Sequence, residues 1–395
     1  MHPVPPMFLG LGANIDYELK WDTQKICQIL DNTEFTDKNS LSISSRIFSC
    51  MKTGQGAEFS VPNESYLNYI CSSIPYQETL GGTAARAALI ISLFNQNCYL
   101  HLVNNQDDYQ HLLPKNVKCI WNEESNLPSS PHVIIQYPAG VRIRHNGGEF
   151  ITPNSNRIIL TADLANEQLP ISNKLTEIVK QCPILLISGF NSITDRNILS
   201  QRLSNLENCM LNKSDCSTVI YEDAAFHDEK LHKYVIESVT KYADILSFNE
   251  DELSSLLGFE VDIRDIHQMS HVIDVLDSQF PNNTTILHNS IWNGTSAPAS
   301  SKLFNALKFA VSTSTSRYIF GDSISKDRIY NTYRKITLDT TNELVTTLNN
   351  KTTWSFIGTP QVDCPYPTTI GLGDSFIGGL MTALNDPSIT NTTRS

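Results

Sequence analysis

The sequence predicts an α/β fold in which a mainly parallel central sheet is covered by helices on both faces. The main observation is an alternation in the second half of the chain, where short runs rich in Ile, Val and Leu are separated by segments with apolar residues at helical spacing. A second observation is that no internal repeat or low-complexity linker interrupts this alternation. Parallel strands are buried on both faces and are connected by helices, so they produce apolar runs in this order.

The expected elements of the second half follow from this alternation. The helical segments carry apolar residues three or four positions apart, as Leu231, Val235, Ile236 and Val239 illustrate. Strands are expected at residues 183–188, 217–221, 244–248 and 284–289, and helices at 195–211, 228–242 and 263–276.

The first half is less regular. It opens with an apolar strand at residues 7–12 and has one expected helix at 21–30. Two glycines, Gly81 and Gly82, then lead into a helix of small and later apolar residues, a start that lets a backbone pack closely against a sheet or a ligand. Further strands are expected at 98–103, 132–137, 141–145 and 156–160, with a turn at 146–148.

Two stretches, at about 17–75 and 136–160, do not fit the alternation. The first is polar and irregular, and we expect it to be peripheral. Together they are expected to form a smaller, discontinuous lid layer on a single domain that spans residues 1–395.

Composition excludes several classes of protein. The chain has 395 residues, of which 40% are hydrophobic and 18% charged, and it can bury a large core. A formal net charge of -12 argues against a nucleic-acid binder and favours a small ligand. Nine cysteines without a Cys-x-x-Cys pair indicate reduced thiols. Because no apolar stretch is long enough to span a membrane and no signal peptide is seen, we expect a cytoplasmic protein, with the secretory pathway left open.

A glycine-rich turn near the end of the chain is the strongest candidate site. Gly371, Gly373 and Asp374 stand where an apolar segment with helical spacing begins. Free backbone N–H groups at a helix start bind phosphate, and glycine lets the phosphate approach. A carboxylate beside that phosphate can take the proton of an attacking hydroxyl. The alternative is that Asp374 only caps the helix.

Polar residues also follow several expected strands, at the edge where open α/β sheets bind ligands. Asn14 and Asp16 follow the first strand, and Asp16 can hold a sugar hydroxyl or close an Asx turn. Glu222 ends a later strand, and Asn249 and Glu252 follow the next one. Such oxygen ligands suit Mg²⁺, often through water, while the alternative for Asn249 is a helix N-cap.

Three arginines, Arg142, Arg144 and Arg157, lie within a short span of this acidic chain. They are either solvated surface residues or ligands for phosphate groups, which the planar guanidinium fork suits.

Taken in order, these motifs resemble the ADP-dependent glucokinase and phosphofructokinase family of the ribokinase-like superfamily, from about residue 8 to 385. Two of the motifs look closer to the eukaryotic ADP-dependent glucokinases. Three positions differ from the family pattern: Thr83 replaces Asn or Gln, Ile220 replaces His, and Thr368 replaces a basic residue. The motifs are Asn14-Ile15-Asp16, Gly81-Gly82, Tyr137-Pro138-Ala139-Gly140, Asn156-Arg157-Ile158, Leu186-Ile187-Ser188-Gly189, Glu222, Asn249-Glu250-Asp251-Glu252-Leu253 and Thr369-Ile370-Gly371-Leu372-Gly373-Asp374.

The resemblance implies a ribokinase-like fold and a role for each candidate residue. Asp374 would be the general base, with Gly371 and Gly373 forming the anion hole. By the same resemblance, Asn14, Asp16, Gly81, Gly82 and Thr83 would bind the sugar, Arg157 and Leu372 the nucleotide, and Glu222, Asn249, Glu252 and Asp374 the Mg²⁺ site.

The implied activity is transfer of the β-phosphoryl group of ADP to the 6-hydroxyl of glucose, giving glucose 6-phosphate and AMP. Fructose 6-phosphate is the alternative acceptor, because Arg142 and Arg144 could bind a second phosphate. The other alternative is a weakly active or inactive relative that binds sugar or nucleotide. Retention of Asp374 favours the enzyme, since a binding protein does not need a general base.

Overall fold

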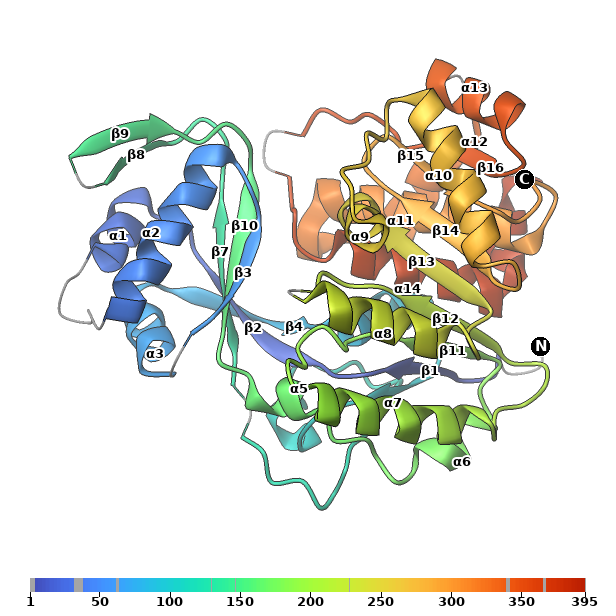
Figure 1. Ribbon diagram of the computed structural model, residues 1–395, viewed down its shortest axis with the longest axis horizontal. Helices are drawn as coiled ribbons and strands as arrows, with labels where there is room; N and C mark the ends of the chain where they lie inside the picture. Colours follow the sequence, from blue (N-terminus) through green and yellow to red (C-terminus); the bar gives the residue numbers. More distant parts are fainter. Residues whose placement is uncertain are drawn as a thin grey trace. The chain divides into compact units, whose positions relative to one another are not determined.

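A computed structural model of the chain describes residues 4–31, 38–61, 64–128, 130–145, 147–226, 228–338, 342–364 and 367–394. The chain forms two compact units, which are described separately (Figure 1). Unit 1 comprises Met1–Ala13, Gly82–Asn126 and Asn166–Ser395, and unit 2 comprises Asn14–Gly81 and Leu127–Ala165.

Unit 1 is built on a nine-stranded sheet. Its strands are parallel except at one edge, where β15 runs antiparallel to both of its neighbours. Across the sheet the order is β16 (Ser355–Gly358), β15 (Trp292–Thr295), β14 (Thr284–His288), β13 (Ile245–Asn249), β12 (Thr218–Glu222), β11 (Ile184–Ile187), β1 (Met7–Gly10), β5 (Cys98–His101) and β6 (Val117–Ile120).

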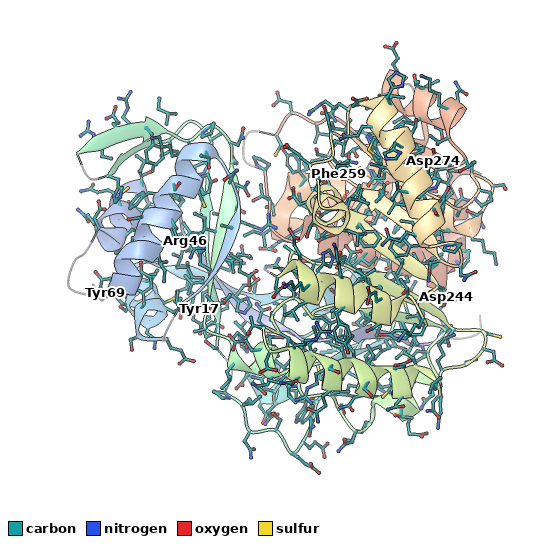
Figure 2. All side chains as sticks on the ribbon, viewed as in Figure 1. Tyr17, Arg46, Tyr69, Asp244, Phe259 and Asp274 are labelled. Atoms are coloured by element: carbon teal, nitrogen blue, oxygen red, sulfur yellow. The ribbon has the colours of Figure 1, made fainter. Side chains whose placement is uncertain are left out.

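Helices cover both faces of this sheet. On one face α4, α11 and α14 pack together, and α7 and α8 lie on the other, in front of the sheet in Figure 1. Side chains fill the space between the sheet and these helices (Figure 2). The helices are α4 (Thr83–Leu93), α5 (Leu164–Gln168), α6 (Leu175–Val179), α7 (Arg196–Met210), α8 (Glu229–Val239), α9 (Glu250–Leu257), α10 (Ile266–Gln279), α11 (Lys302–Phe320), α12 (Lys326–Leu338), α13 (Glu343–Lys351) and α14 (Leu372–Asn385), with 3-10 turns η2 (Gln106–Asp108), η3 (Gly321–Ser323) and η4 (Pro387–Arg394).

Local sequence explains where the helices after the parallel strands begin. Asp195, Asp228, Asn249 and Asp265 are the N-caps of α7, α8, α9 and α10, and each side chain accepts hydrogen bonds from backbone N–H groups of the first turn. These bonds satisfy donors that have no partner inside the helix. The elements expected in the second half of the chain are therefore found close to their predicted positions.

Helix α14 approaches its two neighbours more closely than side chains would allow. A Cβ at Gly378 would lie 2.9 Å from the carbonyl oxygen of Ala87 on α4. One at Gly379 would lie 2.5 Å from the hydroxyl of Thr313 on α11. The two glycines thus seat α14 directly against both helices.

The described residues of unit 2 form a five-stranded mixed sheet, a two-stranded hairpin and three helices. Its core includes Ile26 of α1, Ile47 of α2 and Leu67 of α3, packed with sheet residues such as Ile135 and Ile158. The sheet order is β3 (Ala57–Ser60), β10 (Asn156–Thr161), β7 (His132–Tyr137), β2 (Asn14–Leu19) and β4 (Tyr76–Gly81), the hairpin is β8 (Arg142–His145) with β9 (Gly148–Ile151), and the helices are α1 (Thr23–Leu30), α2 (Lys38–Thr53) and α3 (Glu64–Ser73).

Two expectations for the first half of the chain are wrong. Asn14 and Asp16 do not form a turn after the first strand, because they begin strand β2, which pairs with β4 and β7. Residues 17–75 are not an irregular periphery, since the described part of this range contains helices α1, α2 and α3 and much of the core of unit 2. That unit 2 acts as a lid stays a prediction, and residue 146 of the expected turn lies outside the described residues.

Candidate active site

The glycine-rich turn opens helix α14, as the sequence predicts. Gly371 is the N-cap residue with φ 70°, a left-handed conformation that favours glycine. In the described chain no side-chain hydrogen bond caps this helix start. Asp374 lies in the first turn of the helix, beyond the cap position, so the interpretation of Asp374 as an N-cap is wrong. The turn therefore presents uncapped N–H groups next to a carboxylate.

The end of helix α11 holds the segment that leads into this turn. Arg317 donates from Nε to the carbonyl oxygen of Ile370 at 3.3 Å, and it forms an ion pair with Asp322. The N–H of Thr368 donates to the carbonyl oxygen of Tyr318 at 3.0 Å. These contacts fix the backbone immediately before Gly371.

A buried arginine beside Asp374 was not expected from the sequence. Arg86 of α4 is 6% exposed, and its Nε lies 3.9 Å from Oδ2 of Asp374. A Cβ at Gly371 would lie 3.0 Å from Cδ and Nη1 of Arg86, so glycine there leaves room for the guanidinium. The signal in the sequence was a single charged residue within the alanine-rich start of α4.

Glu222, at the end of β12, reaches the same region of unit 1. Its Oε1 lies 3.1 Å from Nε2 of His288, whose ring stacks on Phe376 of α14 with centroids 4.6 Å apart. A Cβ at Gly373 would be 3.8 Å from Oε1 of Glu222. The structure thus brings Glu222 to the first turn of α14. His288 was not predicted from the sequence, because its position depends on the pairing of β14 with β13.

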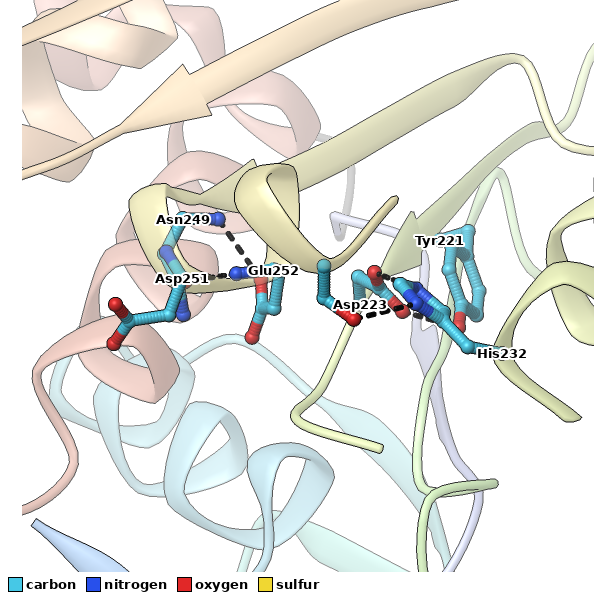
Figure 3. Close-up of polar contacts among 7 residues, drawn as sticks. Tyr221, Asp223, His232, Asn249, Asp251 and Glu252 are labelled. Atoms are coloured by element: carbon cyan, nitrogen blue, oxygen red, sulfur yellow. Dashed lines mark hydrogen bonds and ion pairs between the residues drawn. The ribbon is translucent and has the colours of Figure 1, made fainter. Parts of the chain in front are cut away.

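Asn249 and Glu252 form a capping box at the start of α9 (Figure 3). The Oδ1 of Asn249 accepts from the N–H groups of Asp251 and Glu252, both at 2.9 Å. In return, Oε2 of Glu252 accepts from the N–H of Asn249 at 2.8 Å. The N-cap interpretation of Asn249 is therefore confirmed, and it leaves one oxygen of Glu252 outside the capping box.

Several carboxylates lie close together here. Burial, followed by the charges of Asp223 and Glu222, raises the pKa of Glu252 well above its usual range. Asp223 itself accepts from Tyr221 at 2.8 Å and lies 2.6 Å from Nε2 of His232, which fixes its carboxylate (Figure 3). Burial and these neighbours thus disfavour the ionised form of Glu252, and a cation bound here would favour it.

These residues fit Mg²⁺ held through water. In the described parts of the chain, no group of three or more His, Cys, Asp or Glu side chains is arranged to ligate a metal directly. However, Oε2 of Glu222 is buried without a hydrogen-bond partner among the described residues. A buried carboxylate oxygen of this kind needs a donor, and a water molecule of a hydrated cation would supply one.

Three of the five predicted sugar-binding residues, Asn14, Asp16 and Gly81, form a compact group in unit 2. Asn14 and Asp16 are both buried, and Nδ2 of Asn14 donates to Oδ1 of Asp16. Gly81 pairs with Asn14 across β2 and β4, and a Cβ at Gly81 would lie 2.3 Å from Oδ1 of Asp16. Glycine is required because the two polar side chains occupy that space. Gly82 and Thr83 belong to unit 1, where Gly82 is the N-cap of α4 and Thr83 its first residue.

The three predicted phosphate-binding arginines are also found in unit 2. Arg157 lies on β10 and is half-buried. Arg142 and Arg144 of the β8–β9 hairpin both pair with Glu149, and their side chains are 61% and 81% exposed. Both arginines therefore share one neighbouring carboxylate, which offsets one of their two positive charges.

A histidine near Asp16, His132, is expected to make the stability of the fold depend on pH. Burial acts to lower the pKa of His132, but its hydrogen bond to Asp163 at 2.9 Å and the charges of Asp163, Asp16 and Glu58 raise it overall. A raised pKa in the folded state stabilises the protein fully below the unfolded value of about 6.5, and this contribution is lost as pH rises through the folded value.

We therefore expect the free energy of unfolding, measured with urea, to fall between pH 6 and pH 8, and His132→Gln to reduce that fall. His267→Gln, at an exposed position on α10, is the control and should leave it unchanged. An equal pH dependence in all three proteins would contradict this assignment.

Comparisons with known proteins agree with this fold. A family model described as the ADP-specific phosphofructokinase/glucokinase conserved region matches residues 5–288. The structure is similar to a phosphofructokinase from Pyrococcus horikoshii with AMP, at 16% identity and a TM-score of 0.75, covering 98% of this chain and 99% of that chain. It is also similar to an ADP-dependent kinase in complex with fructose-6-phosphate and ADPβS, at 13% identity and a TM-score of 0.73, covering 99% and 95%.

A third similar structure is that of the last common ancestor of ADP-dependent phosphofructokinases from Methanosarcinales, at 14% identity and a TM-score of 0.72, covering 97% and 94%. No curated protein matches the chain. At such identities the likeness concerns the fold, and it confirms the predicted α/β fold class. Among the described residues no helix has the length and apolar character needed to span a membrane.

Proposed function

This chain belongs to the ADP-specific phosphofructokinase/glucokinase family of sugar kinases, and on that basis we propose that it transfers the β-phosphoryl group of ADP to the 6-hydroxyl of glucose. The observation that carries the proposal is the start of α14, where an uncapped helix N-terminus and Asp374 stand in one turn. Phosphoryl transfer requires a place for the transferred anion and a base for the acceptor hydroxyl. Both are supplied by residues 371–374.

In the proposed reaction, Asp374 accepts the proton of the sugar hydroxyl as its oxygen bonds to the β-phosphorus. The bond from that phosphorus to the bridging oxygen breaks, and AMP leaves. The N–H groups following Gly371 donate to the oxygens of the transferred group, where negative charge is concentrated. Asp374 is 23% exposed at its side chain, so an acceptor hydroxyl has access to it.

The acidic residues have a separate role in this proposal. Glu222 and Glu252 would hold Mg²⁺ through water, and Asn249 would keep Glu252 in place through the capping box. When bound, Mg²⁺ offsets the negative charge of the nucleotide phosphates. Asp374 is proposed to contribute to the same Mg²⁺ site. Leu372 and Arg157 are proposed to bind the nucleotide.

The acceptor is the finer part of the proposal. Asn14 and Asp16 form a buried pair of a donor and a carboxylate, which suits neutral sugar hydroxyls. Glucose is favoured because the arginines suggested for a second phosphate, Arg142 and Arg144, are already paired with Glu149. The alternative acceptor is fructose 6-phosphate, which is supported by the solved phosphofructokinases of similar fold.

One assay separates these possibilities. The purified chain is incubated with Mg²⁺, with glucose or fructose 6-phosphate, and with ADP or ATP, and the sugar phosphate formed is measured. Formation of glucose 6-phosphate with ADP is expected. Turnover with ATP and none with ADP would overturn the donor assignment, and faster turnover of fructose 6-phosphate would overturn the acceptor. Binding of sugar or nucleotide without turnover by any pair would indicate a binding protein.

Replacement of Glu252 by Gln tests the proposed cation site. The amide of Gln can still accept the N–H of Asn249, so the capping box is kept while the group that can ionise beside a cation is removed. We expect the Mg²⁺ concentration for half-maximal rate to rise about tenfold, and the melting temperature without Mg²⁺ to stay equal or increase. Glucose affinity should not change. An unaltered Mg²⁺ dependence would leave Glu252 with a capping role only.

A further inference from the structure

We propose that Arg86 is a further catalytic residue, whose guanidinium contacts the transferred phosphoryl group beside Asp374. This inference rests on the proposed function, since it assigns a ligand to the same turn. No motif of the sequence pointed to Arg86, and its position is known only from the packing of α4 against α14.

The first argument is the placement of the guanidinium. Arg86 is 94% buried, and it faces the two features that define the proposed phosphoryl site. On one side Nε lies 3.9 Å from Oδ2 of Asp374, and on the other Gly371 omits the Cβ that would come within 3.0 Å of Nη1. The positive charge is thus held at the N-terminus of α14, where the uncapped N–H groups are found.

The second argument is the length of the contact with Asp374. Charge-assisted hydrogen bonds between arginine and a carboxylate measure about 2.7–2.9 Å. At 3.9 Å the two groups attract each other electrostatically but form no hydrogen bond. The Oδ2 of Asp374 is therefore not occupied by the Nε–H group of Arg86. The contact is therefore compatible with a base that must receive a proton from a substrate hydroxyl.

The third argument is chemical. A guanidinium presents several N–H donors in a plane and can bind two oxygens of one phosphoryl group. Negative charge on the oxygens around the β-phosphorus must be stabilised as the group moves between oxygens. A cation that is already buried and positioned does this without reorganisation of solvent.

A structural role is the competing explanation. Arg86 would then serve only to hold α4 against α14, with the ion pair to Asp374 as one of its contacts. The two roles differ in their dependence on the ligand. A structural arginine affects AMP and ADP binding equally, whereas an arginine that contacts the transferred group affects ADP, which carries that group, and spares AMP.

The test is to measure the dissociation constants of ADP and AMP by calorimetry, together with turnover, for the full chain and for Arg86→Met. Met has a similar length and no charge. Because it leaves Asp374 without its partner, and removal of one member of a buried ion pair is destabilising, the folding of the variant is checked by its melting temperature. Arg202→Met is the matched control, because Arg202 has a structural contact elsewhere in unit 1. Its Nε, on α7, donates to the carbonyl oxygen of Gln168, on α5, at 2.8 Å.

For Arg86→Met we expect the affinity for ADP to fall by about tenfold or more, AMP affinity to change by less than about threefold, and turnover to fall by about 10² to 10³. Arg202→Met should leave the ratio of the two affinities unchanged. Arg86→Lys keeps the charge and loses the planar fork, so it should recover part of the ADP affinity and little of the turnover. If Arg86→Met does not fold, the same two measurements on Arg86→Lys decide.

Equal losses for ADP and AMP, or turnover within about tenfold of the unmodified chain, would overturn the role of Arg86 while leaving the proposed function intact. If the unmodified chain neither binds ADP nor phosphorylates a sugar, the proposed function fails, and the assignment of Arg86 fails with it. The two failures are thus distinguished by the behaviour of the unmodified chain.

Discussion

Asp374→Asn should remain folded and bind sugar and ADP, yet turn over about 10² to 10⁴ times more slowly, which is the usual contribution of a general base. Asn has the same size and can hydrogen-bond to the same neighbours, but it cannot accept the proton of the hydroxyl. Because Asp374 lies beyond the N-cap of α14, the substitution removes no helix cap. The measurement is the steady-state rate, with binding followed separately by calorimetry.

A second aspartate near the other end of α14 provides the control for this prediction. Asp386 follows the last residue of the helix, and its carboxylate accepts from Ser388. Asp386→Asn should keep the full rate. If Asp374→Asn stays folded, binds both ligands and loses less than about tenfold in rate, then Asp374 is not the base and a binding function becomes the better explanation.

Gly81→Ala is expected to have the largest effect in unit 2. The added Cβ would lie 2.1 Å from Nδ2 of Asn14 and 2.3 Å from Oδ1 of Asp16, distances that no side chain can keep. Both polar groups must therefore move, or β4 must shift against β2. We expect kcat/KM for the sugar to fall by about 10²-fold or more, since displacements of about 1 Å have this effect.

The extra methyl group should also reduce the free energy of unfolding by about 1–3 kcal/mol. Gly148→Ala is the matched control in the same unit, because the nearest atom to its Cβ would be the carbonyl oxygen of His145 at 3.4 Å. That variant should retain its stability and rate. If Gly81→Ala keeps a normal KM for the sugar, Asn14 and Asp16 do not bind it.

The parallel strands of unit 1 could be predicted from the sequence, whereas most of unit 2 could not. Strands such as β11 and β12 are buried on both faces and consist of continuous apolar runs, a signal that needs no knowledge of their partners. In α2 the buried residues Ile43, Ile47 and Met51 recur four positions apart, but the serines and other polar residues between them hid this helical pattern. The pattern does not indicate strand β2, because a carboxylate, Asp16, is buried in the first half of the strand.

The residues of the candidate site likewise divide into those that the sequence pattern indicates and those that it does not. Glycines before an apolar helix mark a phosphate-binding turn in the sequence itself, so Gly371, Gly373 and Asp374 were found by their pattern. Arg86 and His288 were not, because each reaches the site through the packing of one element on another. Asn249 was predicted with two alternatives, and its capping role depended on hydrogen bonds that only the structure could supply.

The close seating of α14 has an evolutionary consequence. Gly378 and Gly379 lie within two turns of Asp374. Gly378 leaves space for the backbone of Ala87 and the Cβ of Ile90, and Gly379 leaves space for the side chain of Thr313. A Cβ at position 379 would lie 2.8 Å from the Cβ of Thr313, so a larger residue there requires glycine at position 313. At position 378 the opposing atoms include the backbone of Ala87, which no substitution removes. Related sequences should therefore vary at 379 and 313 as a pair and keep glycine at 378.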